Sequence, residues 1–285
     1  MGKVQKIRAA VSLAAALGLF AVSAYAAGKA DKKAAQSAGR KTADGRTLLR
    51  VQADAAPHAE LLEFVKPKLA AQGISLEITA VTDRAQANAQ TAGGEFDANF
   101  FQHEPYLQSV VAEKGYDLVS GGAVHVEPIG AYSDKYRAKA ELPDRAKIAI
   151  PSDATNEYRA LRVLEREGFI RLKPGADALQ TTVGNAVAAY LKPVALAELD
   201  FALIPLAKAN FDAYITNTST ILEAGIDPAS ALFREGRDSP YANILAIKAD
   251  RKDDPALKAL YQALTGEDVR RFIEDKYKGA VIPAF

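Results

Sequence analysis

Residues 48–80 read LLRVQADAAPHAELLEFVKPKLAAQGISLEITA and predict a strand, a helix and a second strand in succession. A short apolar strand covers 48–53, and Pro57 then opens a helical pattern with one apolar face, made of Leu61, Leu62, Val65 and Leu69. Gly73 ends the helix, and residues 74–80 alternate apolar and polar side chains as a half-buried strand does. Because strands joined through a helix run in one direction, this unit predicts a parallel sheet.

The same alternation of strand and helix continues along the chain in two series, which predicts an α/β protein with two lobes. The first series adds a strand near 96–101, a helix over 105–114 and strands around Leu118 and Ile129. The second contains a strand at 147–150, a helix over 155–167, a helix near 181–190, and strands near Leu196 and at 213–216. A strand over 243–248 and helices over 255–264 and 267–277 come last.

The final strand and helices are expected to return to the first lobe, so that two chain crossings form a hinge. Lobe 1 then comprises residues 47–131 plus 236–285, and lobe 2 comprises residues 132–235. A chain of 285 residues in which 49% are apolar is long enough to bury a core in each lobe.

The first 26 residues have the layout of a signal peptide. Lys3, Lys6 and Arg8 precede an apolar run that ends in Ala24-Tyr25-Ala26, the small-residue pattern that a signal peptidase cleaves. The alternative is an uncleaved membrane anchor, because the apolar run is close to the minimum length that spans a bilayer. Residues 27–46, rich in Ala, Gly and Lys, are expected to form a flexible leader.

Charge and cysteine content exclude several functions. The net charge is +1, but residues 1–26 carry three cations and no acid, and residues 27–46 carry six cations and two acids, which leaves −6 for residues 47–285. An acidic body disfavours binding to nucleic acid. The chain has no cysteine, so it has no disulfide, no cysteine ligand for a metal and no thiol that accepts a lipid. A periplasmic or secreted protein without a lipid anchor is therefore expected.

Enzymatic signatures are absent from the sequence. It contains no GxSxG, HExxH or P-loop, and the turn after the first strand lacks the glycines that a dinucleotide needs. The three histidines, His58, His103 and His125, are too scattered to predict a metal site, and each is expected to be a packing residue. No cofactor is predicted. A catalytic triad assembled only by folding stays open as an alternative.

Polar residues gather where two predicted strands end. The run 153–159, DATNEYR, follows the strand at 147–150, and places Asn156 and Arg159 three residues apart on one helix face. A helix N-terminus beside a guanidinium can hold a carboxylate, and ligands of open α/β sheets lie beyond the carboxyl ends of strands. The alternative is that Arg159 is a solvated surface residue.

The second such run, 97–107 (DANFFQHEPYL), brings aromatic and polar side chains to one junction between a strand and a helix. Aromatic faces with a few polar tips suit a small amphipathic ligand. The alternative is an ordinary edge of the core.

These runs, with three others, resemble the NlpA family of methionine-binding proteins, the substrate receptors of methionine ABC importers. The matching motifs are PHAE at 57–60 with VKP at 65–67, DAN at 97–99, FQH at 101–103, PYL at 105–107, TN at 155–156 with Arg159, Asn217 before EAG at 223–225, and DSPYAN at 238–243. The resemblance implies a type II periplasmic-binding-protein fold with two α/β lobes, no enzymatic activity, and the membrane subunits of an ABC importer as partners.

The resemblance also implies roles for individual residues. Arg159 would bind the ligand carboxylate with support from Asn156, while Asn217 and Asn243 would hydrogen-bond the amino and carboxylate groups. The side-chain pocket would be lined by Phe101, His103 and Tyr106. The alternatives to a binding protein are a secreted α/β hydrolase and a ligand-sensing module that use the same cleft.

The sequence departs from the family at the side-chain pocket. Arg84 stands where members usually have a tyrosine that packs on the methionine side chain, and Thr220 replaces another common tyrosine. A cation beside a thioether is unfavourable unless it is paired or reaches water. We therefore expect a ligand that is more polar or larger than methionine; the alternative is that Arg84 swings outward and methionine still binds.

Overall fold

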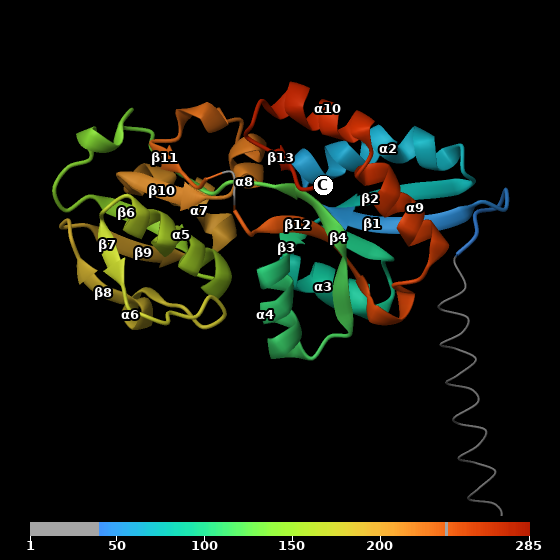
Figure 1. Ribbon diagram of the computed structural model, residues 1–285, viewed down its shortest axis with the longest axis horizontal. Helices are drawn as coiled ribbons and strands as arrows, with labels where there is room; N and C mark the ends of the chain where they lie inside the picture. Colours follow the sequence, from blue (N-terminus) through green and yellow to red (C-terminus); the bar gives the residue numbers. More distant parts are fainter. Residues whose placement is uncertain (1–39, 237–238) are drawn as a thin grey trace, which may run out of the picture.

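The computed structural model describes residues 40–236 and 239–285, and its main strands form two separate sheets. Figure 1 shows the two sheets side by side, each with its own helices. The predicted signal peptide lies outside the described residues, as does Asp238 of the DSPYAN motif. In the described part of the chain, no helix is long and apolar enough to span a bilayer.

The first sheet has six strands in the order β13-β4-β12-β3-β1-β2. β1 pairs in parallel with β2 and β3, as the opening strand-helix-strand pattern predicts, and β12 runs antiparallel to β3 and β4. The strands are β1 Thr47–Ala53, β2 Ile74–Ala80, β3 Ala98–His103, β4 Leu118–Val126, β12 Ala242–Lys248 and β13 Ile282–Pro283.

Helices cover both faces of this sheet, and strand β12 shows why. Leu245 and Ile247 point into the core under α2 Glu60–Ala70, α9 Pro255–Leu264 and α10 Glu267–Tyr277. The alternate residues, Ile244 and Ala246, pack with Leu107 in a second core under α3 Arg84–Gly93 and α4 Glu104–Lys114. A strand whose two faces are both buried has no polar alternation, which is the pattern of residues 243–248.

The second sheet has five strands in the order β11-β5-β10-β6-β9. β6 runs parallel to β9 and β10, while β5 runs antiparallel to β10 and β11. The strands are β5 Gly130–Tyr132, β6 Lys147–Pro151, β9 Ala195–Leu199, β10 Ala213–Thr216 and β11 Phe233–Arg234. The main core lies under α5 Ala154–Arg166, and a smaller one lies near α7 Ile204–Ala207 and α8 Thr218–Glu223.

The chain passes from the first sheet to the second between β4 and β5 and returns between β11 and β12 (Figure 1). These are two crossings, and the last helices, α9 and α10, belong to the first sheet. The residue boundaries assigned to the two lobes, 47–131 plus 236–285 and 132–235, stay a prediction.

One predicted element is wrong. The helix expected near 181–190 is only the four-residue α6, Val183–Ala186, which begins with a capping box between Thr182 and Asn185. The chain then enters β8, Val187–Tyr190, which pairs with β7, Ile170–Leu172. The pattern of residues 181–190 alone could not reveal this, because the partner strand of β8 is supplied by another part of the chain.

The analysis of periodicity also missed α3, because its ten residues carry no broad apolar face.

The predicted leader ends in residues that are bound to the first sheet. Residues 27–39 lie outside the described part, but Lys41 forms a β-bridge with Thr47, and Arg40 donates to Asp97 at 3.3 Å and to the carbonyl of Gly94 at 2.5 Å. The flexible leader expected over 27–46 is therefore corrected for residues 40–46. Its composition is that of a linker, but the carboxylate that holds Arg40 comes from a distant part of the chain.

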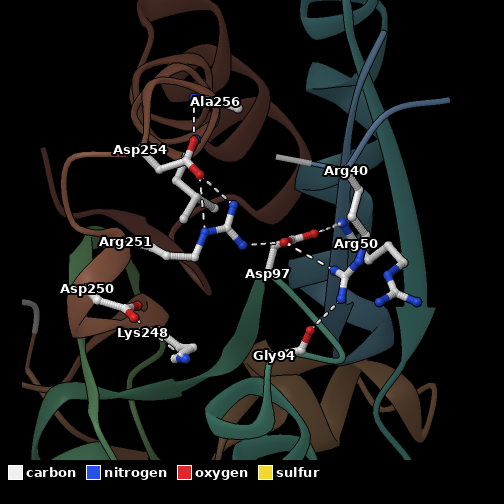
Figure 2. A network of polar contacts seen from close by, with 10 residues as sticks. Arg40, Arg50, Gly94, Asp97, Lys248, Asp250, Arg251, Asp254 and Ala256 are labelled. Atoms are coloured by element: carbon white, nitrogen blue, oxygen red, sulfur yellow. Dashed lines mark hydrogen bonds and ion pairs between the residues drawn. The ribbon is translucent and has the colours of Figure 1, made fainter. Parts of the chain in front are cut away.

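Asp97 is the centre of the network drawn in Figure 2, and its side chain is only 4% exposed. Besides Arg40, it accepts from the backbone N–H of Arg50 at 2.7 Å and from Arg251, whose guanidinium also binds Asp254 at 2.5 Å. Asp254 in turn caps α9 through the N–H of Ala256. One carboxylate thus joins the N-terminal segment, β1 and the start of the C-terminal helices.

We predict that Asp97→Ala lowers the free energy of unfolding by about 3 kcal/mol, because it leaves the largely buried guanidinium of Arg251 with one carboxylate instead of two. Urea titration followed by circular dichroism measures this. The matched control is Lys66→Ala, which removes an exposed ion pair with Glu63 and should cost less than about 1 kcal/mol. Equal losses in the two variants would contradict a structural role for Asp97.

Candidate functional site

A cavity of about 620 Å³ lies between the two sheets. Its walls are built at the carboxyl ends of parallel strands from both sheets. In the first sheet, Asp54 follows β1, and Phe101 and His103 lie at the end of β3; in the second sheet, Asp153 comes just after β6 and Asp200 follows β9. This is where open α/β sheets bind ligands. The size fits a small molecule.

Seven of the eight predicted site residues line this cavity. They come from separate segments that the fold brings together from both lobes. The seven residues are Arg84, Phe101, His103, Tyr106, Asn156, Asn217 and Asn243. Thr220 also lines it. The eighth residue, Arg159, does not. The individual binding roles assigned to these residues stay predictions.

Arg159 is a buried ion pair and not a guanidinium open to the cleft. Its side chain is 1% exposed; its Nε donates to Glu235 at 2.9 Å, its Nη2 donates to the same carboxylate at 2.5 Å and to the carbonyl of Glu127 at 2.6 Å, and its guanidinium lies 4.5 Å from the ring of Tyr241. Arg159 is therefore not the solvated surface residue of the alternative, and its role as a carboxylate clamp stays a prediction. The cause is Glu235, a residue near the return crossing that the helical spacing of residues 153–159 could not reveal.

Asn156 connects the two walls of the cavity. Asp153 caps α5 by accepting the N–H of Asn156 at 3.0 Å, and it also holds the Nδ2 of Asn156 at 3.1 Å. The Oδ1 of Asn156 therefore faces the Nε2 of His103 at 3.1 Å, from one sheet to the other. The Nδ1 of His103 accepts the N–H of Tyr106 at 3.1 Å, so Nε2 carries the proton and donates to Asn156.

His103 is neutral at physiological pH. Burial lowers its pKa to about 4, and the positive charge of nearby Arg159 acts in the same direction. Arg159 does not line the cavity, but its charge helps to keep His103, which does, in the neutral form.

Asn217 is the N-cap residue of α8, yet its side chain accepts no backbone N–H there. Asn is a favoured N-cap because its oxygen normally accepts the N–H two or three residues on. Here the carboxylate of Glu127 accepts the N–H of Ser219 at 2.6 Å instead. The Oδ1 of Asn217 is left buried and without a partner at the wall of the cavity. A buried unpaired acceptor is unfavourable, and a ligand N–H would satisfy it.

Glu127 also gathers the two histidines that the sequence analysis left scattered. His125 Nε2 lies 2.9 Å and His58 Nε2 lies 3.3 Å from the same carboxylate oxygen, and all three residues are buried. Among the described residues this is a set of donors that could hold a metal ion, with ligand atoms within 4.8 Å of one another. A hydrogen bond from His125 accounts for the shorter distance, and His58 Nε2 is hydrogen-bonded to Asn243. The scatter of the three histidines along the sequence did not reveal that the fold brings His58 and His125 to one carboxylate.

The charges of this cluster are fixed by burial and hydrogen bonds. Burial lowers the pKa of His125 to about 4, although its hydrogen bond to Glu127 opposes that shift. Burial alone would raise the pKa of Glu127, but the hydrogen bond from His125 and the charges around it hold the pKa at about 2. His58 Nε2 also lies 3.2 Å from Oδ1 of Asn243, which connects the cluster to the cavity wall.

Arg84 is the only lysine or arginine among the described residues of the cavity wall, which also holds five acids, Asp54, Asp83, Asp153, Asp200 and Glu223. Four of the acids accept a backbone N–H: Asp83, Asp153 and Asp200 cap helices, and Glu223 accepts the N–H of Ala55. Asp54 pairs with Arg84 at 2.8 Å. The sequence analysis missed these acids as cavity residues, although Asp54 and Asp200 directly follow strands, Asp83 and Asp153 cap helices, and Glu223 ends α8.

Comparisons with known proteins agree with this geometry. The sequence model of the family described as NlpA lipoprotein matches residues 49–285. Membrane lipoprotein TpN32 of Treponema pallidum is 39% identical over 230 residues, which are 80% of this chain and 85% of that protein. The methionine-binding lipoprotein MetQ of Bacillus subtilis is 33% identical, over 84% of this chain and 89% of its own.

Solved structures show the same architecture. A nutrient binding protein from Burkholderia cenocepacia, bound to methionine, superposes with a TM-score of 0.78 at 38% identity, over 83% of this chain and all of that one (100%). An ABC transporter periplasmic substrate-binding protein from Coxiella burnetii gives 0.77 at 37% identity, over 83% and 100%. The predicted fold class, a two-lobed α/β binding-protein fold, is confirmed.

The expected location is corrected by the same comparisons. The matching family and the relatives TpN32 and MetQ are named lipoproteins, which contradicts a protein that is free of any lipid anchor. The error lies in the step from a cysteine count to a location. The 285 residues contain no cysteine, the side chain that accepts the lipid. That absence does not by itself say how a protein of this kind is attached to a membrane.

We predict that the free energy of unfolding falls as the pH drops from about 6.5 to about 4. Because His103 and His125 have pKa values near 4 in the fold and near 6.5 when unfolded, the unfolded chain binds more protons in this window. The loss should be on the order of 3 kcal/mol for each histidine. Urea titrations at several pH values measure it, and His125→Gln should remove about half of the dependence. A flat profile between pH 6.5 and 4 would refute the assignment.

Proposed function

Since this chain belongs to the NlpA lipoprotein family, we propose that it is the substrate-binding component of an ABC importer, which captures methionine, or a related or more polar amino acid or peptide, between two lobes. The observation that carries the proposal is the unpartnered Oδ1 of Asn217 at the cavity wall. It supports a ligand that brings its own N–H donor, as the ammonium group of an amino acid does. Relatives named as methionine-binding lipoproteins support the same class of ligand.

The ligand carboxylate requires donors that the fold leaves free. Asn243 uses its Oδ1 toward His58, so its Nδ2 is the group that we assign to the carboxylate. Asn156 has its Oδ1 and Nδ2 engaged by His103 and Asp153, so we assign it to holding the cavity wall. Arg159 supports the site indirectly, by its hydrogen bond to the carbonyl of Glu127 and by the effect of its charge on His103. The ligand side chain lies against Phe101, His103 and Tyr106, whose rings contact one another edge to face.

Capture is a shift between open and closed arrangements of the lobes about the two crossings. The contact between His103 and Asn156 joins the two walls and exists only when the lobes are together. A ligand that touches both walls at once favours the closed arrangement by its difference in affinity for the two. The importer's membrane subunits are the partners that receive the closed form.

Catalysis has no support in the described cavity. A hydrolase of the serine type needs a histidine with a free ring nitrogen beside the nucleophile. Ser152 lines the cavity, but both ring nitrogens of His103 are engaged, by Asn156 and by the backbone of Tyr106. Relatives named as substrate-binding proteins agree with binding without turnover.

We predict that methionine or a more polar amino acid raises the melting temperature of the full chain and is recovered unchanged. At a hundred times its dissociation constant a ligand adds about 2.7 kcal/mol, which thermal shift detects. Asn217→Ala should weaken binding at least about tenfold, because the ammonium loses its acceptor. Asn210→Ala, an exposed asparagine away from the cavity, is the matched control and should bind normally. Turnover of the ligand, or full affinity in Asn217→Ala, would contradict the proposal.

A further inference from the structure

Arg84 presents unused hydrogen-bond donors to the cavity. A guanidinium has five N–H groups, and the structure gives one hydrogen bond, from Nη2 to Asp54 at 2.8 Å. The side chain lines the cavity and is 29% exposed, and Nε and Nη1 make no hydrogen bond to the described residues. Its Cζ lies 4.1 Å from the centroid of the ring of Phe201, which belongs to the opposite wall. Part of the N–H edge of the guanidinium is therefore free of hydrogen bonds to the described residues.

Two carboxylates of the cavity wall act on this guanidinium. Asp54 fixes the guanidinium, and the charge of Glu223 also acts on Arg84. Glu223 lies six residues after Asn217, at the other end of α8, roughly 9 Å further along the helix axis. Both residues line the cavity, and so does Thr220 between them. A ligand whose ammonium binds Asn217 and whose side chain extends along α8 reaches Arg84 and its carboxylates with its far end.

We infer that the ligand is an amino acid whose side chain ends in a carboxamide, with its carbonyl accepting from Arg84 and its NH₂ donating to Asp54 or Glu223. This inference rests on the proposed function and specifies its substrate class. A carboxamide offers an acceptor and two donors on one carbon, the complement of a guanidinium beside carboxylates. Glutamine has this chemistry, and a side chain of its length with hydrogen bonds at both ends spans roughly the distance along α8.

Other side-chain chemistries fit this end of the cavity less well. A thioether has only a weak acceptor, so it would bury the free edge of Arg84 without satisfying it. A carboxylate would face Asp54 and Glu223, where two negative charges stand against one positive charge. An ammonium group would face the guanidinium. A neutral group that both accepts and donates meets neither repulsion.

Calorimetry on the full chain, freed of any co-purified ligand, tests the inference with glutamine, asparagine, glutamate, methionine and norleucine. We expect glutamine or asparagine to bind at least about tenfold more tightly than the other three, the size of one hydrogen bond to a charged group. Arg84→Leu should abolish this preference by weakening the carboxamide ligand about tenfold or more, while methionine and norleucine bind as well as before or better.

Phe201→Leu is the matched control, because it removes the aromatic partner of Arg84 across the cavity and leaves the N–H edge intact. It should weaken all ligands by a similar factor. If Arg84→Leu does the same, Arg84 acts only on closure of the lobes and the inference is overturned. Tight methionine binding with weak glutamine binding also overturns it, but leaves the proposed function standing. If no amino acid binds the wild-type chain, the proposed function itself fails.

Discussion

The buried carboxylate of Glu127 is the constraint on which the site depends. It lies just after β4, where the chain leaves the first sheet; it accepts from His125 and from the N–H of Ser219, and His58 Nε2 lies 3.3 Å away. Its backbone carbonyl accepts from Arg159 of α5, the helix that packs on the second sheet. A buried anion is stable only when it is this well paired, so Glu127 ties both sheets to one point beside the cavity.

Each of these bonds sets a group that faces the ligand space. By accepting the N–H of Ser219, Glu127 replaces Asn217 as the cap of α8 and leaves the amide of Asn217 for the cavity. Through His58 it fixes Oδ1 of Asn243, which leaves Nδ2 as the free donor. The two amides at the cavity wall are thereby left with different free groups: the acceptor Oδ1 of Asn217 and the donor Nδ2 of Asn243. That is the arrangement that a zwitterion requires.

The charges around the cavity are explained almost completely by the fold. Arg159 is neutralised by Glu235, and four of the five acids at the cavity wall accept backbone N–H groups. Arg84 with Asp54 is the exception, because the pair leaves guanidinium donors free beside a second carboxylate. The charged groups at the cavity wall are thus paired or bound to the backbone, except for the free guanidinium donors of Arg84.

The sequence by itself determined the two α/β series, the parallel pairing of β1 with β2, and the gathering of polar residues at strand ends, because these follow from local periodicity and from the short range of helix and turn signals. It also supplied seven of the residues that line the cavity, largely through motifs that resemble a known family. Only the tertiary structure decided the partner of each polar group. Arg159 met Glu235, Arg40 met Asp97, and His58 met His125, over separations that no local pattern records. A buried charge or amide takes its role from the group that satisfies it, and that group is chosen by the fold.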